Sequence, residues 1–402
     1  MFQLFLLQVL LLAVVVRVPT AQAAHDNMVN KTKLIQLTRR LIRIDSQNPP
    51  GDEFAIASFV KDYLKALNLK PKIYEFKKRR TNVLVTLKGR KQKRSLLITP
   101  HLDTVPKGRS WSFDPFAARI HQGKIYGLGA TDCKGNLAAA LEVIRSLVEE
   151  KAKLDYNLVF AATADEESGS GLGLVPLLDK GILRADAAVV LDSDDFNVVI
   201  TQKGLIHLKV KIQGKKAHGA YPWRGINAID RAIKILSALK AYRFEGKNNK
   251  YLKPPTLNIG TIKGGDKVNV VADWCEFELD FRFLPGMSEK KILSDLKNII
   301  KKFARKFKIE IEGIQKPYRI NEGHLLVRCL VAAMHKIGIR PKIKGSEGAT
   351  VITFFQDKDI PALAWGFGAK GCAHIADEYI KIENLYRGTL ALDRFLKDYQ
   401  FK

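Results

Sequence analysis

Cysteine is scarce in this sequence, and the few cysteines present are far apart. The 4 cysteines among 402 residues form no C-x-x-C pair; they are Cys133, Cys275, Cys329 and Cys372. This spacing offers neither a disulfide framework nor a thiolate cage for a metal, so free thiols are predicted. A G-x-S-x-G elbow is absent as well, which argues against a serine nucleophile.

Acidic residues are in the minority. There are 41 Asp and Glu against 67 Lys and Arg, which gives a formal net charge of +26. The basic residues are spread along the chain, and no zinc-finger, RRM or helix-turn-helix pattern accompanies them. We therefore predict a solvated basic surface that favours anionic substrates, and no nucleic-acid partner.

Long apolar runs are missing, apart from one near the N-terminus. Residues 2–16 are almost wholly apolar, and a small-residue segment (AQA) follows at 21–23. One interpretation is a signal peptide over 1–23, which directs export to the periplasm. The other is that Met28 is the true start of a cytoplasmic protein, because an amphipathic pattern begins directly after it. The run is too short for a stable membrane span.

The rest of the chain is too long for one ordinary core, which favours two domains. Strands alternate with helices, and acidic residues follow the strand ends, so we predict an α/β sheet with its site beyond the carboxyl ends of its strands. Helices are predicted at 31–44, 54–67, 136–148, 323–337 and 381–399, and strands at 72–76, 82–87, 96–98, 157–162, 187–191 and 361–366.

A different order occupies residues 201–314. Strands at 205–213, 256–262, 275–283 and 309–313, with helices at 225–239 and 288–307, give the β-α-β-β-α-β order of a ferredoxin-like α+β unit. The simplest organisation is an insert at 201–314 within a catalytic domain formed by 25–200 and 315–402. Residues 1–24 are then an extension outside the folded enzyme.

Histidines and carboxylates follow the predicted strands or lie in a glycine-rich loop. The candidates are His101, Asp103, Asp132, Glu166, Glu167, Asp192 and His374. Imidazole and carboxylate without thiolate suit zinc, cobalt or manganese. The set exceeds what one tetrahedral ion uses and fits a two-metal centre with a bridging carboxylate and water. Of two adjacent glutamates, one can bind metal while the other takes a proton from that water.

Five ordered segments resemble the M20 family of metal-dependent deacylases and carboxypeptidases, the ArgE/DapE group in particular. They are 99–108 (TPHLDTVPKG), 127–135 (GLGATDCKG), 163–169 (TADEESG), 191–192 (LD) and 371–378 (GCAHIADE). The resemblance implies a zinc-exopeptidase-like domain, a central sheet flanked by helices, with a dimerisation insert. It implies two Zn²⁺ (Co²⁺ or Mn²⁺ being possible) held by His101, Asp132, Glu167, Asp192 and His374.

The same resemblance assigns roles to individual residues. Asp132 bridges the two ions, Asp103 orients His101, and Glu166 is the general base. The peptide bond after Asp132 is expected to be cis, and Cys133 is expected to pack without binding metal.

The insert and the segment after it carry further matches. His218, in 215–222 (KKAHGAYP), corresponds to a histidine that reaches the partner subunit's site in a homodimer, where it stabilises the oxyanion. Asn269 and Arg282 match residues that grip a substrate carboxylate, and an arginine fork suits a carboxylate. Gly345 and Ser346 belong to a substrate-binding loop. In that loop Val351 stands where the family usually has aspartate, which leaves loop geometry and substrate preference open.

These expectations describe a homodimeric two-zinc amidohydrolase of N-acyl amino acids such as N-acetylornithine or N-succinyl-diaminopimelate. The alternatives are a carboxypeptidase or dipeptidase with the same chemistry, and a metal-free binding protein with the same fold. The other histidines are interpreted as structural or surface residues; they are His25, His121, His207, His324 and His335.

Overall fold

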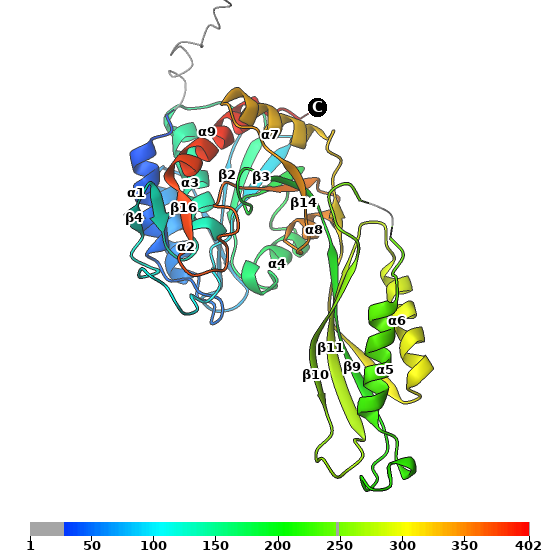
Figure 1. The fold of residues 1–402 in the computed structure, drawn as a ribbon. Helices are drawn as coiled ribbons and strands as arrows, with labels where there is room; N and C mark the ends of the chain where they lie inside the picture. The colour runs from blue at the N-terminus through cyan, green and yellow to red at the C-terminus, as the bar shows by residue number, and fades with distance from the viewer. Residues whose placement is uncertain (1–27, 247–248, 402) are drawn as a thin grey trace, which may run out of the picture.

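The computed structural model describes residues 28–246 and 249–401, so the proposed signal segment lies outside the described residues. Figure 1 shows an α/β domain, built from both ends of the chain, and an elongated insert that extends away from it. Within the described residues, no helix is long and apolar enough to cross a membrane.

The α/β domain is organised around a mixed sheet, which has nine strands within the described residues. The strands are β1 (Lys72–Glu75), β2 (Thr81–Leu87), β3 (Ser95–Thr99), β6 (Asn157–Ala162), β7 (Ala187–Val190), β8 (Val198–Gln202), β13 (Tyr318–Arg319), β14 (Ile343–Ser346) and β15 (Ala362–Trp365). Their order is β1-β2-β6-β3-β7-β15-β8-β13, with β14 beside β8. Strands β6, β3, β7 and β15 are mutually parallel, so their carboxyl ends lie along one edge.

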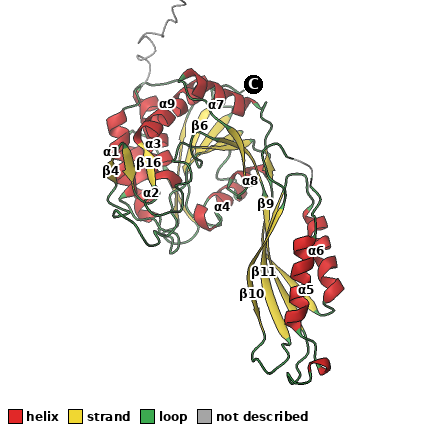
Figure 2. Ribbon diagram, in the orientation of Figure 1, coloured by secondary structure: helices red, strands yellow, loops and turns green. Residues whose placement is uncertain are grey.

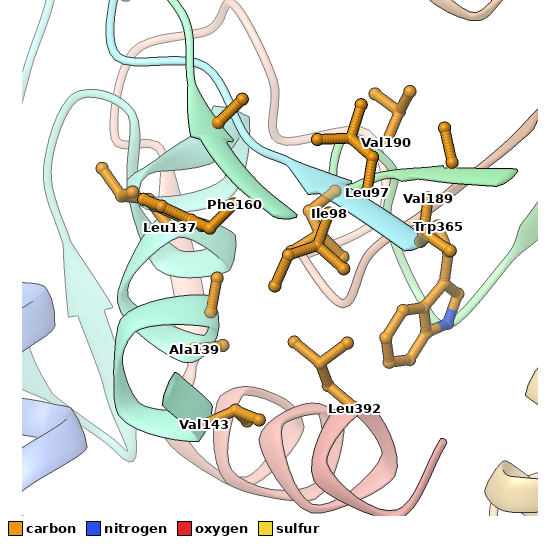
Figure 3. Packing of buried hydrophobic residues seen from close by; sticks show 14 of the residues in the cluster. Leu97, Ile98, Leu137, Ala139, Val143, Phe160, Val189, Val190, Trp365 and Leu392 are labelled. Atoms are coloured by element: carbon orange, nitrogen blue, oxygen red, sulfur yellow. The ribbon is translucent and has the colours of Figure 1, made fainter. Parts of the chain in front are cut away.

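Helices pack on the sheet and bury its apolar strands (Figure 2). They are α1 (Lys31–Ile42), α2 (Phe54–Ala66), α3 (Gly135–Glu149), α4 (Leu174–Asp179), α7 (Leu325–Lys336), α8 (Ile352–Gln356) and α9 (Ile382–Asp398). Helix α3 is buried along most of its length because it lies between the sheet and helices α1 and α9. In Figure 3, Leu137 and Val143 of α3 and Leu392 of α9 lie near Ile98 and Phe160 of the central strands.

The insert has its own sheet and its own apolar core. Its elements are β9 (Gly204–Gln213), α5 (Ala228–Ala241), β10 (Thr256–Gly264), β11 (Trp274–Phe283), α6 (Glu289–Phe303) and β12 (Phe307–Gln315). The strand order is β10-β11-β9-β12, and all neighbours are antiparallel. Alternate residues of β9 and β11 pack beneath α5 and α6, which leaves the other face of the sheet open. The predicted α/β fold with a ferredoxin-like insert is confirmed.

The bounds of the last helix and the last strand of the insert differ from the prediction. The helix predicted over 288–307 ends at Phe303, because Ala304 is extended, and the last strand of the insert is longer than expected. A small sheet was not predicted; it consists of β4 (Arg119–His121), β5 (Lys124–Tyr126) and β16 (Tyr379–Lys381). This small sheet joins the segment before Asp132 to the segment after His374 and so brings two candidate ligands together.

Candidate metal centre

Most of the candidate ligands lie at the carboxyl edge of the parallel strands. His101 follows β3, Asp192 follows β7, and Glu166 and Glu167 form a short 3-10 turn after β6. His374 lies in the long loop between β15 and β16. Because these strands are parallel neighbours, their trailing loops meet over one point of the sheet.

Asp132 is presented by the glycine-rich loop that leads into α3. Gly129 adopts a left-handed conformation with φ of 79°, which a residue without Cβ tolerates. The buried carboxylate of Glu378 accepts hydrogen bonds from the backbone amides of Gly129, Thr131 and Asp132, at 2.8, 2.8 and 2.9 Å. These three bonds fix the loop and therefore the direction of the Asp132 side chain.

The two oxygens of Asp132 face two different histidines. Oδ1 lies 2.9 Å from His101 Nε2, and Oδ2 lies 3.1 Å from His374 Nε2. His374 Nε2 is also 3.2 Å from Glu167 Oε2. The Asp132 carboxylate thus stands between two imidazoles, which is the place of a ligand shared by two ions.

Two groups of side chains converge closely enough to hold an ion. Ligand atoms of His101, Asp132 and Glu167 lie within 4.8 Å of one another, and so do those of His101, Glu166 and Asp192. Both glutamates are therefore near the centre. Oxygen and imidazole donors suit a divalent cation such as zinc, cobalt or manganese.

The electrostatics of this cluster call for positive charge. Burial and the Asp132 and Glu167 carboxylates raise the pKa of Asp192 to about 7. Burial and the charge of Asp192 raise the pKa of Glu166 well above its ordinary value. Oε1 of Glu167 is buried without a hydrogen-bond partner among the described residues. Crowded carboxylates and an unpartnered acceptor fit the binding of divalent cations.

Asp103 was expected to orient His101, and the structure gives its side chain a wider set of contacts. Nδ1 of His101 is 3.0 Å from the backbone oxygen of Asp103, while the Asp103 carboxylate is 3.6 Å away. That buried carboxylate accepts from the backbone amides of Glu166 and Glu167, each at 3.1 Å, and from Asn48 Nδ2 at 2.9 Å. Asp103 therefore holds the turn that carries both glutamates.

A buried ion-pair network supports the same turn from the other side. Arg80 donates to Glu53 through Nε at 2.7 Å and Nη2 at 2.8 Å. Nη2 also lies 2.7 Å from Asp165 Oδ1, and all three side chains are buried. Because Asp165 directly precedes Glu166, this network anchors the start of the turn.

Cys133 packs against the backbone of His101. Its Sγ accepts from the His101 amide at 3.2 Å and donates to the His101 carbonyl at 3.4 Å. Burial raises the pKa of the Cys133 thiol to about 12, which keeps it protonated. The Asp132–Cys133 peptide bond is cis, as the resemblance implied.

Two cavities flank the carboxylate cluster. The larger, of about 460 Å³, is lined by Asp132, Glu166, Glu167, Asp192 and His374, and also by residues of the insert. The smaller, of about 230 Å³, lies over Asp132 and Asp192 and is lined by Gly345 and Ser346 of β14. Val351 contributes to the larger cavity. The predicted substrate-binding loop thus borders the site on both sides.

The other predicted substrate residues lie on the insert, at two different places. Arg282 is on β11 and pairs with Leu205 near the start of β9. Its Nε and Nη2 donate hydrogen bonds to the Asp280 carboxylate at 2.7 and 2.9 Å. His218 and Asn269 belong to adjoining loops, joined by a hydrogen bond from the Gly219 amide to the Asn269 carbonyl. These loops lie at the end of the insert farthest from the α/β domain (Figure 1). Within one protomer, the structure does not bring them to the carboxylate cluster.

Several residues that build the site were not identified from the sequence. Glu378 and Asp165 lie within segments that carry the family resemblance, but nothing in the sequence assigns them a role, and Arg80 lies outside those segments. His207 was interpreted as a strand residue without function, yet its side chain lines the larger cavity. Alternation along β9 placed it on the open face, and nothing in the sequence says what that face meets.

Comparison with known proteins places the chain in a family. The model of Peptidase family M20/M25/M40 matches residues 97–398. Aminopeptidase PepT from Bacillus cereus is similar in structure, with 23% identity and a TM-score of 0.78 over 92% of this chain and 99% of that chain. An M20 family metallo-carboxypeptidase from Sulfolobus solfataricus has 22% identity and a TM-score of 0.75, over 91% of this chain and 98% of that chain.

A third similar structure is described as a dinuclear metal-binding peptidase. It is the YXEP protein of Bacillus subtilis, an M20 family member with 17% identity and a TM-score of 0.71, over 91% of this chain and 97% of that chain. These identities show the fold alone, and the narrower resemblance to the ArgE/DapE group stays a prediction. The family model, in contrast, covers most of the sequence and all of the candidate ligands, and this chain therefore belongs to peptidase family M20/M25/M40.

Proposed function

We propose that this protein is a two-metal hydrolase that cleaves an amide bond in a small substrate with a free carboxylate. The observation that carries the proposal is the position of Asp132, whose two oxygens face His101 and His374 at 2.9 and 3.1 Å. A carboxylate shared between two imidazoles, amid three further carboxylates, suits two zinc ions better than one.

The ions would be held by His101, Asp132, Glu167, Asp192 and His374. When bound, two zinc ions lower the pKa of a shared water and polarise the amide carbonyl. Glu166 is the general base: its carboxylate takes a proton from the attacking water and returns it to the leaving nitrogen. Its raised pKa, caused by burial and by Asp192, suits both halves of this transfer.

The active form is proposed to be a homodimer. His218 and Asn269 lie at the far end of the insert, a position from which they would reach the site of a second copy. Apolar side chains at this end are exposed, with Trp223 at 73% and Val268 at 102% of full exposure. In the dimer, His218 donates a hydrogen bond to the oxyanion, and Asn269 contributes to binding the substrate carboxylate.

The trans arrangement is tested by mixing two inactive variants. Glu166→Gln lacks the base, and His218→Ala lacks the oxyanion donor. A heterodimer of the two contains one complete site, because the Glu166→Gln subunit still supplies His218. Co-expression should therefore restore activity that neither variant has alone. No recovery in a verified heterodimer would exclude a role for His218 across the interface.

Two substrate classes compete. Short peptides are supported by the aminopeptidase and carboxypeptidase names of similar structures. N-acyl amino acids, with an acetyl or succinyl group, are supported by the sequence resemblance to the ArgE/DapE deacylases. Both present an amide near a free carboxylate, which agrees with the basic surface.

The deciding assay offers dipeptides, tripeptides, N-acetyl and N-succinyl amino acids in parallel, with and without chelator. Glu166→Ala serves as the inactive control. The preferred class is the one with the highest kcat/KM. Hydrolysis that survives both chelation and loss of Glu166 would refute the two-metal mechanism.

A further inference from the structure

His207 lies on the open face of the insert's sheet and faces the metal centre. It is on β9, directly opposite Asp280 of β11. Its side chain is 46% exposed and lines the larger cavity together with Glu166, Glu167 and His374. One wall of this cavity therefore comes from the α/β domain and the other from the insert.

Asp280 connects His207 to Arg282. The Asp280 carboxylate accepts two hydrogen bonds from the Arg282 fork, at 2.7 and 2.9 Å. Its Oδ2 also lies 3.5 Å from Nε2 of His207. Arg282 is not among the residues that line either cavity at the centre, within the described chain. The guanidinium of Arg282 is therefore bound to Asp280, whereas the imidazole of His207 lines the cavity.

His207 differs in charge type from most of the polar side chains around this cavity. Asp132, Glu166, Glu167 and Asp192 give the metal end a negative wall. Within residues 28–246 and 249–401, the only basic side chains lining the cavity are His374 and His207. His374 is engaged by Asp132 and Glu167. Within one protomer, a substrate anion in this cavity therefore meets a basic side chain outside the ligand set only at His207, among the described residues.

We propose that His207 is a specificity-determining residue that binds the free carboxylate of the substrate, with Asp280 and Arg282 as its positioning residues. The inference rests on the proposed function, because it assumes a substrate carboxylate beside the scissile amide. With Nε2 directed at Asp280, the other ring nitrogen has no partner among the described residues. A ring N–H of an imidazole in this position donates a hydrogen bond to a carboxylate in the cavity.

The test compares three variants on paired substrates. His207→Gln keeps a polar side chain of similar size without the imidazole, and His207→Lys places an ammonium group at the same position. Lys211→Gln is the matched control, because Lys211 lies on the same strand and face with 45% exposure and outside the cavity lining. The substrates are the best dipeptide and the best N-acetyl amino acid of the panel, each as the free acid and as the C-terminal amide.

We expect His207→Gln to raise KM for the free acid, with kcat changed much less. A charged hydrogen bond of ordinary strength corresponds to a loss of roughly ten- to a hundredfold in kcat/KM. The amide should lose less than about threefold, because it offers no anion to bind. His207→Lys should recover part of the free-acid activity. Bound metal, measured by elemental analysis, should stay at the wild-type level in all three variants.

Two results would overturn the inference. One is a His207→Gln enzyme that matches Lys211→Gln on the free acid; the other is an equal loss on acid and amide. If the wild type does not turn over the amide, inhibition constants of the free acid and the amide of the product are compared instead, with the same criteria. A wild-type enzyme that hydrolyses no free acid would refute the proposed function itself, which separates the two failures.

Discussion

Replacing Asp103 with asparagine tests whether this carboxylate holds the turn that carries Glu166 and Glu167. Asparagine has the same shape but only one acceptor oxygen. In its best orientation, that oxygen keeps the bonds from the Glu167 amide and from Asn48. The new NH₂ group then faces the Glu166 amide, which now donates to the carboxylate at 3.1 Å.

The expected loss of stability follows from these contacts. One hydrogen bond to a charged acceptor, worth about 1.5–3 kcal/mol, is removed, and one partly buried amide is left unsatisfied. We expect the free energy of unfolding of the metal-free protein to fall by about 2–4 kcal/mol in denaturant titrations. Metal affinity should fall about ten- to a hundredfold, because the residue supports the ligands without binding metal.

The difference in free energy of unfolding between the wild type and Asp103→Asn should depend on pH in a defined direction. Burial raises the pKa of Asp103, but His101, Asn48 and the Glu167 amide outweigh it and hold the pKa below the ordinary 3.8. A lowered folded-state pKa contributes stability above the unfolded value, and this contribution is lost as the pH falls through the folded value. The wild type and Asp103→Asn should therefore differ by a constant amount at neutral pH and converge only in strong acid.

The control is Asp114→Asn, because Asp114 is exposed and accepts one backbone amide, that of Phe116, at 2.9 Å. It should change stability by less than about 0.5 kcal/mol. An Asp103→Asn protein that unfolds and binds metal like this control would refute the role assigned to the carboxylate. A loss of stability with unchanged metal affinity would show that the turn does not position the ligands.

Other predictions follow from the same contacts. Glu166→Gln should retain bound metal but lose activity by about 10²–10⁴-fold in kcat. In the wild type, kcat/KM should decrease as the pH is lowered, with a midpoint above the ordinary 4.5, because the pKa of Glu166 is raised and only its ionised form is a base. Arg80→Met leaves the buried carboxylates of Glu53 and Asp165 without their ion-pair partner, and calorimetry should show that the free energy of unfolding falls by about 3–5 kcal/mol. The control Arg79→Met should lower it by less than about 1 kcal/mol, because the partner of Arg79 is exposed. Dialysis against chelator should lower Tm and abolish activity, and added zinc should restore both; a Tm indifferent to chelator would contradict the metal centre.

The strands and the histidine and carboxylate residues that follow them could be predicted because both depend on local patterns. Apolar strands end just before His101, at Ala162 and just before Asp192. In a parallel sheet the carboxyl ends of such strands lie along one edge. The residues that hold these ligands could not be predicted, because their partners are distant in sequence. Glu378 is 249 residues from Gly129, and Arg80 is 85 residues from Asp165.

The insert shows the same limit. Its β-α-β-β-α-β order and the alternation along β9 were evident from the sequence, and the resemblance pointed to Arg282. Arg282 and Asp280 are only two residues apart, but the sequence does not show that their side chains bind each other instead of solvent or substrate. Which side chain of the open face meets the candidate metal centre depends on how the insert is attached to the α/β domain, and no local pattern encodes that attachment.

The larger cavity is built by two separate apolar cores, and this has a consequence for how activity is lost. The proposed metal ligands depend on the core that includes α3 and α9, whereas Leu205, His207 and Gln315 depend on the core beneath α5 and α6. Melting of the insert alone would therefore leave a protein that still carries its ions but has lost one wall of its substrate site. If the proposed ions are bound, heat inactivation should precede metal release, and the temperature interval between the two would measure how independently the two cores unfold.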